Sequence, residues 1–206
     1  GPHTGKFEEF TDFEQVKSAY EQQVEYFVKM MVSSLNAIEK LHSDYTPHIY
    51  CSMLLDGCME KGKDCTCGGA KYDFTGVQGV GIADVGDSLT AIKELVFEEK
   101  RITKEELIEG LKTNFASNPI LQHILLNKAP KYGNDIEVAD EMVAYVGEQY
   151  CNCVRKYKNM HGGAYRPGLF CLSSNTPLGK QVCALPSGRE AATPLGDGGI
   201  SPKHGM

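Results

Sequence analysis

The stretch GGAKYDFTGVQGVGIADVGDSLTAIKELVFEEKRIT, from Gly68 to Thr103, decides the fold. Its first part, Lys71 to Val80, mixes aromatic and β-branched residues with glycine, which favours an extended segment packed closely against other backbone. From Val85 to Val96 apolar residues recur in steps of three and four, which indicates a helix that ends near Lys100. Extended segments that alternate with helices suggest an α/β fold.

Upstream of this stretch, an apolar stripe runs from Phe13 to Leu41 and predicts one long amphipathic helix. Thr11 or Asp12 is placed to cap its start. The helix must end before Pro47, since the residue ahead of a proline is pushed toward extended geometry. We expect Pro47 to Ser52 to form a short strand or extended segment and Met53 to Lys61 a helical turn.

Downstream, Thr103 and Glu106 form a capping box, which predicts a helix that carries Leu107, Leu111 and Phe115. Asn134 with Glu137 predicts the start of a further helix. Its expected buried face comprises Ala139, Val143, Val146, Tyr150, Cys153 and Tyr157.

From Gly162 the chain is rich in glycine, proline and serine, with one strand candidate at Leu169 to Ser174. Two or three strand candidates are too few for a closed sheet, and the sequence contains no internal repeat. We therefore expect a helix-rich α/β chain that is part of something larger.

Composition argues against several classes of protein. The chain has 206 residues, with 21 Lys and Arg against 27 Asp and Glu, and this net charge of −6 lacks the basic footprint that nucleic acid requires. No apolar run approaches the roughly 18 residues that cross a membrane, and GPHTGKFEEF does not resemble a secretion signal. We expect a cytoplasmic protein that binds neither nucleic acid nor membrane.

The eight cysteines leave three hypotheses open: a disulfide framework, a metal site, and reduced structural thiols. A chain of this length without a secretion signal does not need disulfides. The pairs CTC (65–67) and CNC (151–153) have one spacer, whereas zinc sites usually have two to four, so reduced thiols are favoured and no metal ligands are assigned.

Three other patterns have a chemical and a structural interpretation. The glycines of GVQGVG precede a helix as a phosphate loop would, but their gaps are reversed from the dinucleotide-binding order. Cys58 and Glu60 suggest a thiol with a carboxylate nearby, yet residues two apart on a helix point in different directions. No two of the six histidines have the i, i+4 spacing of a helical metal site.

The stretch from Gly68 to Thr103 resembles the corresponding part of glycyl radical enzymes of the pyruvate formate-lyase family. The similarity is greatest to the dehydratase and choline trimethylamine-lyase-like branch. It continues through SMLLDGCMEKGKD (52–64), and YRPGLFCLSSNTPLGKQVCALPSGREAATPLGDGGISP (165–202) resembles the family's NVPLG, GALPDGR and PLADGG series. The opening HTGKFEEFTDFEQV is also similar, so the resemblance covers essentially residues 1–206 as a middle-to-late portion of a longer enzyme.

This resemblance implies part of a ten-stranded α/β barrel that encloses two loops, one with a thiyl cysteine and one with a radical glycine. GCME (57–60) superficially matches the cysteine loop, but its surroundings match a later structural segment of the family, so Cys58 is not expected to be catalytic. No RVxGY-like run is present. We therefore expect the catalytic cysteine loop and the glycyl radical domain to be absent from this chain, which contains no catalytic residue.

Four residues are substrate-pocket candidates. His48 and Tyr50 align with a PxPF-like family segment near the substrate, although Ile49 and Tyr50 depart from the usual proline and phenylalanine. A histidine or tyrosine there could act as a hydrogen-bond donor or as an acid–base group. Ser173 and Asn175 lie at the end of the strand candidate at Leu169 to Ser174.

The leading hypothesis is a fragment of an anaerobic lyase or dehydratase that acts on a small organic substrate by thiyl hydrogen abstraction and is inactive alone. The resemblance implies a glycyl radical in the full-length protein, installed by an S-adenosylmethionine iron–sulfur activating enzyme, and a homodimer, with no cofactor bound to this chain. The alternatives are a non-catalytic scaffold or partner subunit that uses the barrel wall, a metal-binding module, or an arylacetate-decarboxylase-like or formate acetyltransferase-like member.

Overall fold

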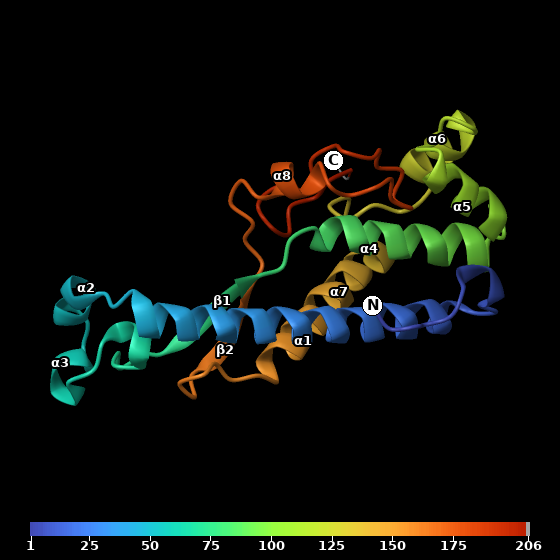
Figure 1. The fold of residues 1–206 in the computed structure, drawn as a ribbon. Helices are drawn as coiled ribbons and strands as arrows, with labels where there is room; N and C mark the ends of the chain where they lie inside the picture. The colour runs from blue at the N-terminus through green and yellow to red at the C-terminus, as the bar shows by residue number, and fades with distance from the viewer. Residues whose placement is uncertain (205–206) are drawn as a thin grey trace. The chain divides into compact units, whose positions relative to one another are not determined.

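A computed structural model describes residues 1–204, which form two compact units (Figure 1). The first, called the sheet unit here, comprises residues 1–2, 23–77 and 150–168; the second, called the helical unit, comprises residues 3–22, 78–149 and 169 onward. The long helices α1 (Phe13–Tyr45) and α7 (Glu137–Arg155) each contribute residues to both units. The other elements are η1 (Phe7–Glu9), α2 (Ile49–Leu54), α3 (Cys58–Lys61), η2 (Cys65–Cys67), β1 (Phe74–Gln78), α4 (Ile82–Ala91), the π-helix η3 (Ile92–Glu98), α5 (Lys104–Lys112), α6 (Pro119–Asn127), β2 (Ala164–Gly168) and α8 (Asn175–Gly179).

The sheet unit is built around a two-stranded sheet in which β1 pairs with β2. Its core combines apolar residues of α1, β1 and the end of α7 with the ring of Tyr165, which is 1% exposed. The buried members of this core are Val28, Val32, Val77, Cys153, Val154 and Tyr165. The Tyr165 hydroxyl donates to Asn36 Oδ1 at 2.8 Å, so the one polar atom of this ring has a partner inside the core.

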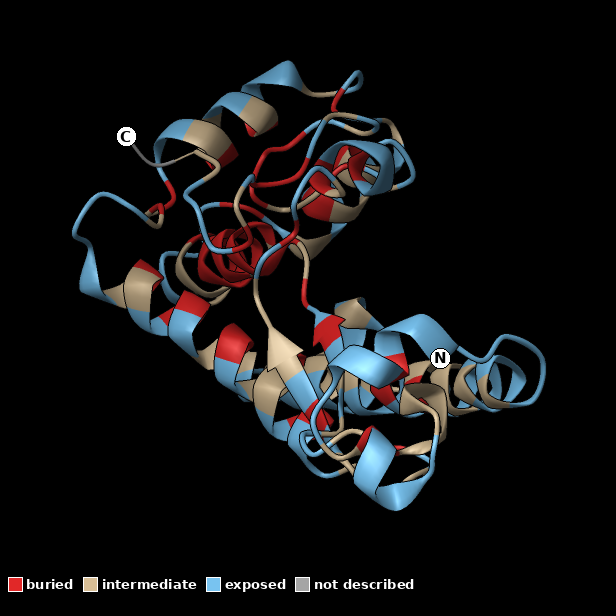
Figure 2. Ribbon diagram, turned by 90° about the vertical axis from the view of Figure 1, so that its left-hand side faces the viewer, coloured by how far each residue is buried: buried red, intermediate tan, exposed pale blue. Residues whose placement is uncertain are grey.

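The helical unit is centred on α4, whose turns are almost entirely buried (Figure 2). Small residues let α4 approach its neighbours closely. A Cβ on Gly86 would lie 2.3 Å from Val143 Cγ2, so glycine is required where α4 crosses α7. Leu95, Leu107, Phe115 and Leu125 complete the apolar interior.

Several sequence-based element predictions are confirmed. Helix α1 begins at Phe13, where Asp12 Oδ1 accepts from Gln15 N at 3.0 Å, and ends at Tyr45, before Pro47. The strand predicted within Lys71 to Val80 is β1, and the helix that follows it is α4 continued by η3.

The capping box of α5 is also present, with Thr103 Oγ1 accepting from Glu106 N and Glu106 accepting from Thr103 N. Phe115, expected in this helix, lies beyond its end with a φ of 62° but is buried. Helix α7 begins at Glu137 rather than Asn134, and Tyr157 of the predicted face lies past its end.

The prediction of a strand at Pro47 to Ser52 is wrong, because residues 49–54 form α2. The carbonyl of His48 accepts from both Ser52 N and Ser52 Oγ at 2.9 Å, and these bonds close the first helical turn directly after the proline. The prediction of a strand at Leu169 to Ser174 is also wrong: the strand is β2, immediately upstream, and residues 172–174 form a turn. Leu172 has a φ of 50°, which a strand does not allow.

Helix α6 was missed by the sequence analysis, although Asn118 caps it by accepting from Leu121 N and Pro119 occupies its first turn. All eight cysteines lie within the described residues, and none of them forms a disulfide. Among residues 1–204, no helix is both long enough and apolar enough to span a membrane.

Candidate functional site

His48 and Tyr50 lie at the start of α2 in the sheet unit. Helix α2 holds them through backbone bonds and leaves both side chains exposed, Tyr50 at 78%. Among residues 1–204, no partner holds the side chain of His48 or Tyr50 in place, and their role at a substrate is still a prediction.

The interior beneath α2 is organised by Asp64. Its carboxylate accepts from Ser52 Oγ at 2.7 Å, from Thr66 N at 2.9 Å and from Thr66 Oγ1 at 2.6 Å. The bonds from Thr66, together with the bond from Ser52, hold the pKa of Asp64 well below its usual value. Asp64 is therefore an ionised structural group that ties α2 to η2.

Cys58 lies in the same region and lines a pocket of about 280 Å³ with Ser52, Met53 and Asp64. Burial, with the nearby Cys65 and Asp64, raises the pKa of its thiol, which disfavours the nucleophilic thiolate. Glu60 Oε2 accepts from Gly57 N at 2.9 Å and caps α3. The geometry thus favours the structural interpretation of both residues.

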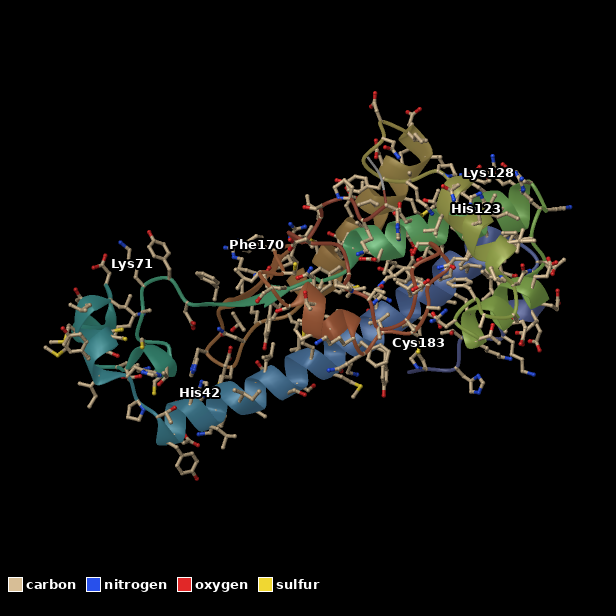
Figure 3. All side chains as sticks on the ribbon, turned by 90° about the horizontal axis from the view of Figure 1, so that it is seen from above. His42, Lys71, His123, Lys128, Phe170 and Cys183 are labelled. Atoms are coloured by element: carbon tan, nitrogen blue, oxygen red, sulfur yellow. The ribbon has the colours of Figure 1, made fainter. Side chains whose placement is uncertain are left out.

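Ser173 and Asn175 belong to the helical unit and lie on residues 169–179, a connection that ends in the short helix α8 and that we call the 169–179 loop. Phe170, labelled in Figure 3, is 57% exposed, and the Ser173 side chain is also exposed. Asn175 is buried, and its Nδ2 donates to Leu195 O at 3.4 Å. The Ser173 side chain is therefore exposed, whereas the amide of Asn175 donates to the backbone of the same unit.

Close backbone contacts fix the base of this loop. A Cβ on Gly199 would lie 1.3 Å from the carbonyl oxygen of Leu169, so only glycine allows the two segments to pass each other. The amide of Phe170 donates to Gln78 Oε1 at 3.0 Å, which anchors the loop to the end of β1 instead of to a strand partner.

Four charged residues are buried in the same helical unit. Asp84 and Asp87 of α4 are both 0% exposed, Arg189 is 2% exposed and Lys131 is 4% exposed. Burial raises the pKa of Asp87 to about 6 and lowers the pKa of Lys131 to about 8. Sequence analysis missed this set, but two aspartates three residues apart in an otherwise apolar and small-residue helix are a signal that could have revealed it.

The four candidates thus fall into two pairs in different units: His48 with Tyr50, and Ser173 with Asn175. Within residues 1–204, no three His, Cys, Asp or Glu side chains are grouped so that they could hold a metal ion. The 169–179 loop, whose base is held by Leu169 and Phe170, places the exposed Ser173 side chain near the exposed side chains of Phe170 and Leu172 in sequence.

Comparison with known proteins places these features in a family. Residues 1–179 match the family described as pyruvate formate lyase-like. The chain is 36% identical over 206 residues to (2S)-3-sulfopropanediol dehydratase of Klebsiella oxytoca, covering 99% of this chain and 25% of that protein. The chain therefore spans about a quarter of the length of the curated relatives it matches.

Solved structures show the same fold. The B12-independent glycerol dehydratase from Clostridium butyricum matches with a TM-score of 0.94 and 43% identity, covering 98% of this chain and 26% of that one. A glycyl radical enzyme from Archaeoglobus fulgidus matches with a TM-score of 0.90 and 37% identity, covering 100% of this chain and 26% of that one. These matches confirm the predicted fold class, a helix-rich part of a pyruvate formate-lyase-like α/β barrel. The chain belongs to the pyruvate formate lyase-like family of glycyl radical enzymes.

Proposed function

We propose that this chain forms residues of the barrel wall in a longer anaerobic glycyl radical enzyme that removes water from a small hydroxylated compound. The observation that carries this proposal is similarity along the whole chain to two dehydratases, at 43% and 36% identity. Both of those proteins are named for hydroxylated three-carbon substrates, which supports a small diol or triol as the substrate class. Loss of one water from such a compound leaves a carbonyl product.

Residues 1–206 supply barrel wall and no catalytic group in this proposal. The thiyl-forming cysteine and the radical glycine come from parts of the polypeptide outside this chain, and residues 1–206 are inactive alone. The chain's own residues shape the substrate pocket, with Ser173 as the strongest candidate because its hydroxyl is exposed on a fixed loop. His48, Tyr50 and Asn175 remain proposed pocket residues.

The family supplies the proposed cofactor and partners. A glycyl radical, installed by an S-adenosylmethionine iron–sulfur activating enzyme, would provide the hydrogen-abstracting chemistry, and no cofactor is assigned to residues 1–206. The full-length enzyme is proposed to be a cytoplasmic homodimer that binds its activating enzyme and a small-molecule substrate.

Two measurements test this function. In an anaerobic extract, an antibody against residues 1–206 should detect a polypeptide several times heavier than 22.6 kDa. That polypeptide, incubated with its activating enzyme, should show an organic radical by electron paramagnetic resonance and convert glycerol or propane-1,2-diol to an aldehyde.

A matched Ser173→Ala variant should keep the radical yield and raise the KM for the diol. A native band at 22.6 kDa would overturn the enzyme proposal for this chain and favour the scaffold or partner subunit. A heavy polypeptide that carries the radical but dehydrates none of the diols would retain the radical chemistry and refute the substrate class.

A further inference from the structure

The helical unit buries two opposite charges that the proposed function does not use, Asp84 of α4 and Arg189. Asp84 is 0% exposed and Arg189 is 2% exposed. Removing a charge from water is costly unless other groups compensate it, so each of these side chains needs a reason to be buried.

All three nitrogens of the Arg189 guanidinium donate hydrogen bonds to backbone carbonyls. Nη2 donates to Gly179 O at 2.8 Å and also to Thr193 O, Nη1 donates to Cys183 O at 3.0 Å, and Nε donates to Pro194 O at 3.5 Å. One planar guanidinium therefore joins the end of α8 to the segment 183–194, a task for which the five donors of arginine are suited and the ammonium of lysine is not.

Asp84 holds the next part of the same segment. Its Oδ2 accepts from Gly196 N at 2.7 Å, across 112 positions of sequence. Its Oδ1 is buried and has no hydrogen-bond partner within the described residues. Burial raises the pKa of Asp84, and the bond from Gly196 N and the charge of Arg189 oppose this rise. Within the described residues, Asp84 and Arg189 do not form a direct ion pair.

The segment between the two charges holds the 169–179 loop. Leu195 N donates to Asn175 O at 3.2 Å, and Asn175 Nδ2 donates to Leu195 O at 3.4 Å, which forms a reciprocal pair. Ser174 N donates to Cys171 O at 2.9 Å, which closes the turn that contains Ser173. Arg189 thus acts on the far end of the loop at Gly179, and Asp84 acts on its middle through residues 195–196.

We infer that Asp84 and Arg189 are positioning residues that clamp the 169–179 loop from both sides of residues 193–196 and thereby set where the Ser173 hydroxyl meets substrate. The hydrogen bonds of Arg189 and Asp84 support the clamp itself, and its effect on substrate rests on the proposed function. Neither residue touches the reacting atoms: Arg189 acts through four carbonyls and Asp84 through one backbone amide.

The clamp is tested in the full-length polypeptide by amide hydrogen exchange. Arg189→Ala should accelerate exchange of amides 173–180 on the order of tenfold or more, because the carbonyl of Gly179 loses its donor. Guanidinium chloride, well below concentrations that unfold the chain, should restore protection by filling the vacated site. Lys180→Ala, at an exposed position on the same segment, is the matched control and should exchange like the unaltered chain.

The role of Asp84 is tested with two substitutions whose side chains are similar in size to aspartate. Asp84→Asn keeps an oxygen that accepts from Gly196 N and should preserve protection, whereas Asp84→Leu removes the acceptor and should expose amides 195–196 to exchange. Loop exchange in Arg189→Ala or Asp84→Leu equal to that of Lys180→Ala, with the helices α4 and α7 still protected, overturns the clamp. Failure of guanidinium to restore protection in a folded Arg189→Ala chain also overturns it.

The consequence for substrate is tested in the full-length polypeptide. Arg189→Ala should lower kcat/KM for the diol on the order of 10- to 100-fold, mainly by raising KM, and should leave the radical yield unchanged. Added guanidinium should restore kcat/KM. Unchanged kinetics beside a loosened loop would refute the positioning role. If the unaltered polypeptide shows neither the radical nor lyase activity, the proposed function is refuted, and so is the contact between Ser173 and substrate. The exchange results would still decide whether the clamp exists.

Discussion

Asp87 should make the stability of the helical unit depend on pH. Its Oδ1 accepts from Tyr132 N at 2.9 Å, but its Oδ2 is buried with no partner within the described residues. Burial is the main reason that its pKa rises from 3.8 to about 6, and Lys131 opposes this rise. Because the folded-state pKa lies above the unfolded value, the folded chain keeps this proton between the two values. The free energy of unfolding should therefore fall as pH rises through that window.

The magnitude follows from the size of the pKa change. Ionising Asp87 in the folded chain should remove about 2 kcal/mol of unfolding free energy between about pH 4 and pH 7. Asp87→Asn keeps an oxygen for Tyr132 N and removes the titration. The difference in unfolding free energy between the unaltered chain and the variant isolates this group, since other titrating groups are common to both.

The assay is urea unfolding at a series of pH values, followed by far-ultraviolet circular dichroism. Relative to the Asp87→Asn variant, the unaltered chain should lose stability as pH rises from about 4 to about 7, by about 2 kcal/mol. Asp56→Asn, at an exposed position, is the matched control. A difference between the unaltered chain and Asp87→Asn that stays constant over this range would refute the reasoning, because it would mean that burial does not hold the proton on Asp87.

Three further predictions concern stability. Tyr165→Phe removes the donor to Asn36 Oδ1 from the core of the sheet unit and should cost about 1 to 3 kcal/mol in urea unfolding, whereas a cost near zero would mean that water replaces the hydroxyl. Thr103→Ala removes the cap of α5 and should cost about 1 kcal/mol, with faster amide exchange confined to its first turn. Gly199→Ala would place a Cβ 1.3 Å from Leu169 O at a φ of 87° and should cost more than about 2 kcal/mol; a variant as stable as the unaltered chain would contradict the close approach.

The long helices were predictable because their signals are local. The stripe of α1, its Asp12 cap and the stop before Pro47 all lie within one segment, and the capping box of α5 spans four residues. Periodicity and capping depend on neighbours three or four positions away, which a single sequence displays completely.

The wrong strand prediction at residues 169–174 arose where distant contacts decide the backbone. Residues 169–174 are apolar enough for a strand, yet the carbonyl of Leu169 meets Gly199 and the amide of Phe170 binds the side chain of Gln78. Both partners are at least thirty positions away, so composition alone favours a strand that the tertiary contacts replace with a loop.

The candidate site shows the same division between local and distant information. Their position at the end of a strand candidate directed attention to Ser173 and Asn175, but this position could not distinguish them. The structure distinguishes their surroundings: Asn175 Nδ2 donates to Leu195 O, whereas the Ser173 side chain is exposed. A change at Asn175 should therefore alter the loop before it alters any substrate contact, and a change at Ser173 should do the reverse. Faster exchange of the loop amides in Asn175→Ala, with unchanged exchange in Ser173→Ala, would support this assignment. The opposite pattern would make Ser173 the structural residue and return the pocket assignment to Asn175.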